Sequence, residues 1–199
     1  NGLLARSLRT VPSIGEIIDV EPSLGCLAQS TGLKVVAEDD ALPFAAQSLG
    51  LAVSGLSLHL VNDLPGALVQ INRALKPDGL LLAALLGGET LKELREAWLL
   101  AEADLFGGAS PRVAPFADVR ELGGLLQRAG FALPVADSDS VRVTYSSPLE
   151  LMQEIRAVGA SNMLTERSRI PVWRRMLLPA SAIYQERFGI SDGRVPATF

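Results

Sequence analysis

The sequence predicts an α/β fold in which a mostly parallel β-sheet carries helices on both faces. Residues 51–58 and 80–86 are short apolar runs, as expected of strands that are buried on both faces. The apolar residues between these runs lie four, three and four positions apart, and they are Leu64, Leu68, Ile71 and Leu75. This spacing makes one apolar stripe on a helix. The three segments therefore form a β-α-β unit, which builds parallel sheets with right-handed crossovers.

Local signals mark both ends of this central helix. Asp63 is suited to the N-cap, and Pro65 then falls in the first helical turn, where its missing N–H costs nothing. Residues 76–79, Lys-Pro-Asp-Gly, predict the end of the helix and a turn into the next strand.

Similar patterns predict the remaining elements in order. Helices are expected at residues 2–9, 22–30, 91–105, 116–129, 148–158 and 172–184. Strands are expected at residues 16–21 and 34–39, with two further strand segments within 131–145.

Composition favours a folded protein and disfavours a nucleic-acid partner. Of the 199 residues, 48% are hydrophobic and 20% are charged, which is enough apolar surface for a core. The net charge is −4 and no long basic run occurs, whereas tight sequence-independent binding of nucleic acid needs many cations to neutralise phosphates.

The sequence also disfavours a metal centre and a membrane-spanning helix. Cys26 and His59 are the only cysteine and the only histidine, and one of each cannot supply the usual zinc or facial iron ligands. We therefore expect no metal centre built from protein ligands. The longest apolar run, residues 80–86, is far shorter than the roughly 20 residues of a membrane helix, so no membrane span is expected.

Four motifs carry a family resemblance over nearly the whole chain. In order they are LSLHLVNDLPGAL, LKPDG, GGETLKELR and DGRVPATF. This set resembles class I S-adenosylmethionine-dependent methyltransferases. It is more closely similar to the methyltransferase-like assembly factors of respiratory complex I, and more distantly to the malonyl-carrier-protein methyltransferases of biotin synthesis.

The resemblance implies a Rossmann-like core at residues 1–147 and a helical, substrate-facing lid of the same domain at 148–199. Against the family pattern, the first strand and two loop glycines that precede residues 2–9 are lacking, and so is the last strand, which the family enters at DGRVPATF. Without the first strand, two apolar strands would face each other with unpaired backbone groups. We therefore expect either a core truncated at its N-terminus or a rearranged sheet.

The resemblance also implies residues that bind S-adenosylmethionine. Gly2 matches the last glycine of the cofactor loop, and Asp19, with Val20 beside it, matches the acidic position that accepts hydrogen bonds from the ribose. Glu38 matches the acidic residue at the adenine amino group, and Asp39 supplies the next backbone N–H. From local sequence alone, Asp19 is better explained as an ordinary acidic residue at a strand end, and the other two acids are equally well explained as a solvated turn.

The loop from Ser54 to His59 is expected to line the donor pocket, with Ser54 and Leu56 beside the cofactor. Ligands in open α/β sheets bind outside the carboxyl ends of the strands, where His59 falls. A neutral imidazole there could accept a proton from the substrate as the methyl group arrives. The alternative is a histidine that is satisfied by a backbone carbonyl and shapes the pocket floor.

The resemblance therefore implies a methyltransferase that acts on an unknown small-molecule or protein acceptor, such as a respiratory-complex subunit. Asn162, Arg167 and Arg169 face either that acceptor or solvent. The resemblance leaves two alternatives, a protein-arginine hydroxylase and a non-catalytic assembly protein. We expect a location in the bacterial cytoplasm, or in the mitochondrial matrix if the protein is eukaryotic; the sequence gives no oligomeric state.

Overall fold

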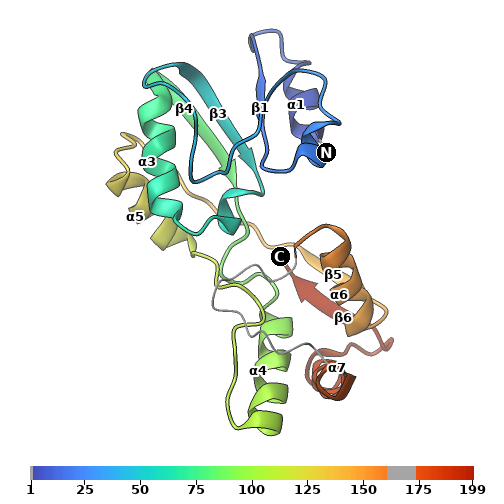
Figure 1. Ribbon diagram of the computed structural model, residues 1–199. Helices are drawn as coiled ribbons and strands as arrows, with labels where there is room; N and C mark the ends of the chain where they lie inside the picture. Colours follow the sequence, from blue (N-terminus) through green and yellow to red (C-terminus); the bar gives the residue numbers. More distant parts are fainter. Residues whose placement is uncertain (1, 161–173) are drawn as a thin grey trace. The chain divides into compact units, whose positions relative to one another are not determined.

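The computed structural model describes residues 2–160 and 174–199. The chain divides into two compact units, each built from two separate stretches of sequence (Figure 1). The first unit contains residues 1–85 and 120–136, and the second contains residues 86–119 and 137–199. The bounds differ from the predicted division after residue 147. Whether residues 148–199 cover a substrate stays a prediction.

The first unit contains two short parallel sheets. Strand β1 (Ile18–Val20) pairs with β2 (Leu33–Val35), and β3 (Leu49–Gly55) pairs with β4 (Leu75–Ala84). Within the described residues no strand pairing joins β1 to β3, so each of them has one unpaired edge. The parallel pairing agrees with the predicted fold class. The strand predicted at residues 34–39 is shorter than expected, since β2 ends at Val35.

The LKPDG motif forms a bulge within β4. Leu49 lies opposite Leu75, but Leu51 lies opposite Leu80, so the intervening residues of β4 are extruded from the ladder. Asp78 there has a φ of 62°, and a Cβ on Gly79 would lie 2.8 Å from the carbonyl oxygen of Lys76. The predicted turn is therefore present, and it lies inside the strand.

Helices of the first unit follow the predicted order. They are α1 (Leu3–Leu8), α2 (Leu24–Leu27), the 3₁₀ helix η1 (Leu58–Leu60), α3 (Leu64–Ala74) and α5 (Val119–Arg128). The predicted cap of α3 is confirmed, because the Asp63 carboxylate accepts a hydrogen bond of 2.9 Å from the N–H of Gly66 and Pro65 lies in the first turn.

The apolar stripe of α3 forms the core of this unit. Ala67, Leu68 and Ile71 are buried, and they cluster with Leu58 of η1 and Leu75 of β4. Burying a side chain the size of leucine contributes about 1.5–3 kcal/mol. This cluster therefore fixes the loop after β3 against α3, and that loop carries several predicted site residues.

The second unit packs three helices around an antiparallel strand pair. Its elements are α4 (Lys92–Phe106), β5 (Arg142–Tyr145), α6 (Pro148–Ala157), α7 (Arg174–Phe188) and β6 (Val195–Thr198). Trp98, Leu151, Met176 and Tyr184 are buried together in its core. The hydroxyl of Tyr184 donates a hydrogen bond of 2.7 Å to the carbonyl oxygen of Pro196.

Buried polar contacts hold this unit together. The Glu102 carboxylate accepts from the guanidinium of Arg112, with an Nη2–Oε1 distance of 2.6 Å, and from the N–H and hydroxyl of Ser110. The Arg112 guanidinium also lies 5.8 Å from the ring centre of Trp98. These contacts fix the Gly- and Pro-rich loop that follows α4.

Three expectations about element positions were wrong. Residues 131–141 form no strand, and Leu133 and Val135 there are 92% and 89% exposed, with no sheet neighbour to cover them. The helix expected from residue 116 begins at Val119. The expected loss of the last strand is also corrected, since residues 195–198 form β6 and pair with β5.

None of the described helices is both long and apolar enough to cross a membrane.

Candidate functional site

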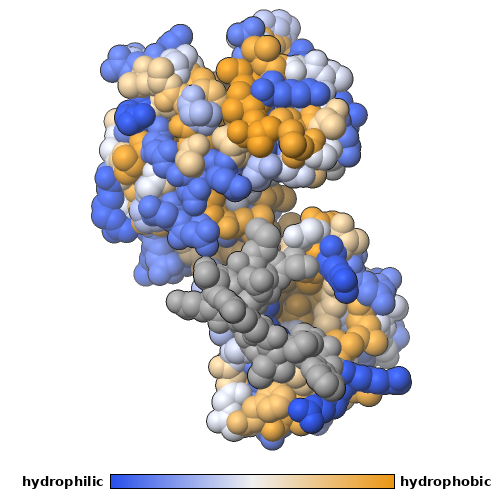
Figure 2. All heavy atoms as spheres, in the orientation of Figure 1, coloured by the Kyte–Doolittle hydropathy of each residue, from blue (hydrophilic) through white to orange (hydrophobic). Residues whose placement is uncertain are grey.

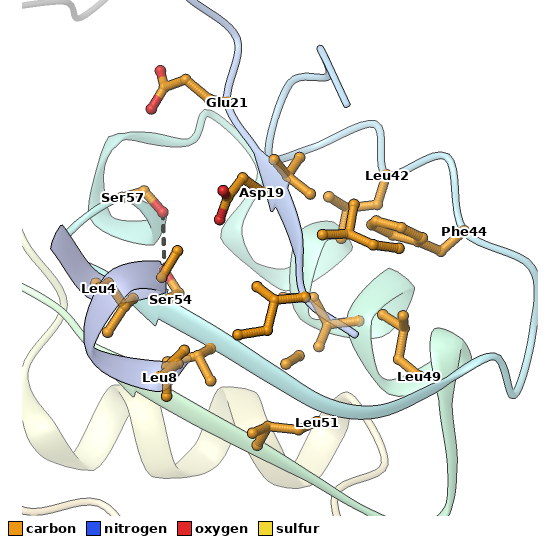
Figure 3. A pocket seen from close by; sticks show the side chains of 18 of the residues that line it. Leu4, Leu8, Asp19, Glu21, Leu42, Phe44, Leu49, Leu51, Ser54 and Ser57 are labelled. Atoms are coloured by element: carbon orange, nitrogen blue, oxygen red, sulfur yellow. Dashed lines mark hydrogen bonds between the residues drawn. The ribbon is translucent and has the colours of Figure 1, made fainter. Parts of the chain in front are cut away.

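A cavity of about 930 Å³ lies within the first unit (Figure 3). Its walls come from α1, α2 and the end of α3, from β1, β3 and β4, and from the loops that follow β1, β2 and β3. The unpaired edges of β1 and β3 both border it. Its volume falls within the range of about 300–1,000 Å³ that is usual for small-molecule sites.

Five of the seven predicted cofactor residues line this cavity, and they are Gly2, Asp19, Val20, Asp39 and Ser54. The structure thus brings together residues that are up to 52 positions apart in the sequence. Gly2 has a φ of 68°, a conformation that favours glycine. Their roles toward a cofactor stay predictions.

The other three predicted site residues lie outside the cavity lining. Glu38 and Leu56 flank residues that do line it, and His59 lies in η1, one residue beyond Leu58. Burial lowers the pKa of His59, so its imidazole is neutral at pH 7. The predicted base is therefore in the protonation state that could accept a proton, but it is not at the cavity wall.

Asp19 is the most strongly held acid of the cavity. Its Oδ2 accepts a hydrogen bond of 3.0 Å from Nη2 of Arg9 and another from the hydroxyl of Ser30. The side chain is 15% exposed, and it points into the cavity in Figure 3. The carboxylate is thus fixed in position by two neighbouring elements.

A second polar group lies at the carboxyl end of β3. The hydroxyls of Ser54 and Ser57 are 2.9 Å apart (Figure 3). The side chain of Ser57 also interacts with the Asp39 carboxyl and favours its ionised form. Burial raises the pKa of Asp39, and the nearby charge of Glu21 raises it further, while the contact with Ser57 lowers it. The net effect is a raised pKa.

The opposite side of the cavity is apolar. Figure 3 shows Leu42, Phe44 and Leu49 there, away from Asp19 and Ser57. Figure 2 shows apolar atoms gathered over the N-terminal elements of the same unit, where Leu3 is 59% exposed. The cavity therefore has an apolar side at Leu42, Phe44 and Leu49 and polar groups at Asp19 and Ser57, which suits a ligand with both kinds of surface.

Gln70 of α3 fixes the acidic loop of the cavity. Its side-chain oxygen accepts a hydrogen bond of 3.0 Å from the N–H of Leu42, and its amide nitrogen donates one of 2.6 Å to the carbonyl oxygen of Asp40. These two contacts anchor the loop on both sides of residue 41. The loop that carries Asp39 is therefore positioned by α3.

Sequence reasoning missed four residues that position the site, and they are Arg9, Ser30, Ser57 and Gln70. Each acts through a partner far away in the sequence or in a neighbouring turn, so neither hydrophobic periodicity nor a local motif marks it. Only Ser57 had a signal, because it falls within the loop that was expected to line the pocket.

Two further expectations concern other parts of the chain. Asn162, Arg167 and Arg169 lie outside the described residues. Within the part of the chain that the structure describes, no group of three or more histidine, cysteine, aspartate or glutamate side chains is placed to hold a metal ion.

Comparison with known proteins gives the class of this chain. Residues 1–83 match the family model described as a methyltransferase domain. The solved structures similar to it include YcgJ from Bacillus subtilis, with a TM-score of 0.58 and 15% identity over 98% of this chain and 82% of that one. They also include an S-adenosylmethionine-dependent methyltransferase from Mesorhizobium loti, with a TM-score of 0.51 and 16% identity over 80% of each chain. Residues 1–83 thus match a methyltransferase domain, and the chain has the Rossmann-like class I fold of the solved methyltransferase structures.

Within that class, the chain has close relatives of two kinds. It is 46% identical to the mitochondrial arginine-hydroxylase NDUFAF5 of Danio rerio and 45% identical to that of Homo sapiens, over 83% and 84% of its length. It is also 40% identical to the malonyl-[acyl-carrier protein] O-methyltransferase of Halorhodospira halophila, over 83% of its length. It spans 51%, 48% and 54% of these relatives, so about half of their length. The predicted family resemblance is confirmed.

Proposed function

We propose that this chain binds S-adenosylmethionine and transfers its methyl group to an acceptor. One observation carries the proposal: five residues that were assigned to the cofactor from sequence motifs line a single cavity of suitable size. The match of residues 1–83 to a methyltransferase domain also supports it.

The cavity residues fit the parts of this cofactor. The two ribose hydroxyls need an acceptor, and the fixed carboxylate of Asp19 faces the cavity. The adenine ring needs apolar cover, which Leu42 and Phe44 supply beside the loop that contains Glu38 and Asp39. Gly2 leaves backbone accessible at the end of the cavity formed by α1.

The chemistry demands little of the protein beyond alignment. The bound sulfonium supplies an activated methyl group, so the main task of the chain is to hold donor and nucleophile in line. Ser54 and Ser57 stand at the carboxyl end of β3, where ligands of open α/β sheets bind, and they would face the acceptor. His59 stays the predicted base, since its neutral imidazole could take the proton that a neutral nucleophile releases.

Calorimetric titration of S-adenosylmethionine and S-adenosylhomocysteine into the complete gene product tests the proposal. We expect both to bind, and we expect Asp19→Ala to weaken binding about tenfold or more, because two ribose hydroxyls lose a charged acceptor. Asp104→Ala is the matched control, since Asp104 is an exposed acid on α4 in the other unit. A folded protein that binds neither ligand would contradict the proposal.

Hydroxylation of arginine is the alternative activity. Identity to the NDUFAF5 proteins reaches 46%, whereas identity to the O-methyltransferase of Halorhodospira halophila is 40%. The two reactions differ in the group added to the acceptor. Mass spectrometry of an arginine-containing protein acceptor after incubation with the gene product distinguishes an added methyl group from an added oxygen atom.

The mitochondrial relatives also suggest a partner and a location. A subunit of respiratory complex I is the protein acceptor that this similarity favours, and a purely non-catalytic role in its assembly remains the third hypothesis. The location would be the mitochondrial matrix in a eukaryote and the cytoplasm in a bacterium. Fractionation of cells that produce the tagged protein, with co-purified partners identified by mass spectrometry, tests both.

A further inference from the structure

The Asp19 carboxylate is held through one of its two oxygens. Arg9 and Ser30 both donate to Oδ2, and among the described residues no hydrogen bond reaches Oδ1. An ionised carboxylate has about four acceptor sites, so two contacts leave about two for a ligand. That number matches the two hydroxyls of a ribose. The protein contacts therefore orient the carboxylate without saturating it.

Arg9 links three segments at this point. It follows the last helical residue of α1, and its Nη2 lies 3.0 Å from Oδ2 of Asp19 on β1. Its Nη1 donates a hydrogen bond of 3.3 Å to the hydroxyl of Thr31, in the segment that follows α2. Because a guanidinium is planar and its donors are rigidly arranged, two contacts of this kind fix its orientation.

Gly32 leaves the space that the guanidinium occupies. A Cβ at this position would lie 2.2 Å from Nη2 of Arg9 and 3.1 Å from its Cζ. The φ of Gly32 is not in the left-handed region, so the backbone conformation does not by itself require glycine. The close approach of Arg9 is thus the physical reason for the missing side chain.

We propose that Arg9 is a positioning residue for the ribose of the cofactor, and that Gly32 makes this role possible by leaving room for its guanidinium. Arg9 would act only through Asp19. It would hold the carboxylate in the orientation that accepts hydrogen bonds from both ribose hydroxyls. The inference rests on the proposed function, because it assumes that a nucleoside occupies the cavity.

Two variants disturb the contact in different ways. Arg9→Met removes the guanidinium, whereas Gly32→Ala keeps every charge and displaces the guanidinium by steric overlap. The displaced group is the end of a flexible side chain, so we expect Gly32→Ala to fold. The matched controls are Arg6→Met, an exposed arginine of α1, and Gly25→Ala, where a Cβ would meet its nearest atom at 3.8 Å.

Affinity for S-adenosylhomocysteine is measured by calorimetry on the complete gene product, beside an analogue that lacks both ribose hydroxyls. We expect both variants to weaken binding of S-adenosylhomocysteine about tenfold, as for neighbours that share one hydrogen-bond network. The analogue should bind wild type and variants alike, because it has no ribose hydroxyl that could donate a hydrogen bond to Asp19. Both controls should bind as wild type does.

Three results would count against the inference. Unchanged binding in both variants, while Asp19→Ala loses binding, overturns the role of Arg9 alone and leaves the proposed function intact. An equal loss for both ligands would indicate general damage to the cavity, and it also overturns the role. Failure of the folded wild-type protein to bind either ligand removes the proposed function itself, and the inference with it.

Discussion

Replacing Arg112 by methionine should lower the free energy of unfolding of the second unit by about 3–5 kcal/mol, the usual cost of breaking a buried ion pair from one side. The side chains of Glu102 and Arg112 are only 4% and 10% exposed. The substitution leaves a buried carboxylate with hydrogen bonds from Ser110 alone. Loss of the contact with Trp98 adds about 0.5–1 kcal/mol within that range.

Two comparisons separate this effect from a general effect of losing an arginine. Arg187→Met removes the partner of Glu96 in the same unit, but those side chains are 52% and 43% exposed, so we expect a cost below about 1 kcal/mol. The double variant Glu102→Gln/Arg112→Met should be more stable than Arg112→Met alone, because the neutral amide still accepts from Ser110 and no unpaired charge remains.

Urea unfolding followed by tryptophan fluorescence measures these differences, since both tryptophans fall within the residue ranges of this unit. Burial alone would raise the pKa of Glu102, but hydrogen bonds from Ser110 and Arg112 together lower it below the ordinary 4.5. The stabilisation by the ionised Glu102 is therefore complete above pH 4.5, and it is lost as pH falls through the lowered pKa of Glu102. A cost as small as that of Arg187→Met, or one that does not diminish in acid, would refute the reasoning.

Three further predictions test other elements. Asp63→Ala should cost about 1 kcal/mol in urea unfolding because α3 loses its cap, while Asp63→Asn keeps most of the stability; equal losses would contradict the capping role. Tyr184→Phe should cost about 1–3 kcal/mol, because the buried carbonyl of Pro196 loses its donor, and an unchanged stability would argue against that bond. The pKa of Asp39 is raised in the folded protein. The contribution of this group to the free energy of unfolding is therefore present below pH 3.8 and is lost as pH rises through the raised pKa. Asp39→Asn should remove that loss, so its melting temperature should exceed that of wild type only at higher pH, and a constant difference would oppose this.

Local sequence signals predicted the elements that depend on neighbours in the chain. Asp63 and Pro65 marked the start of α3 correctly, because a helix cap is made within one turn. The apolar stripe of α3 predicted its buried face for the same reason. The sequence also placed Asp19 at a strand end and Ser54 in the loop expected to line the pocket, and both line the cavity. Ligands of open α/β sheets bind at the carboxyl ends of the strands.

The parts that were missed depend on contacts between distant segments. Leu133 and Val135 have the apolar character of a strand, yet a strand forms only where another strand offers its edge. The contact between Arg9 and Asp19 similarly depends on how α1 and β1 pack, and on the space left by Gly32. No local pattern distinguishes Arg9, the residue after α1, from Arg6 within that helix.

The interleaving of the two units has a consequence for synthesis on the ribosome. The first unit has all of its residues once position 136 has emerged, although residues 86–119, which belong to its neighbour, emerge before that point. The second unit cannot complete its fold until β6 has been synthesised, because β5 has no antiparallel partner before residues 195–198 emerge. During that interval α4 carries an apolar face that lacks its cover, which makes this stage of translation the one most open to chaperone binding and to proteolysis.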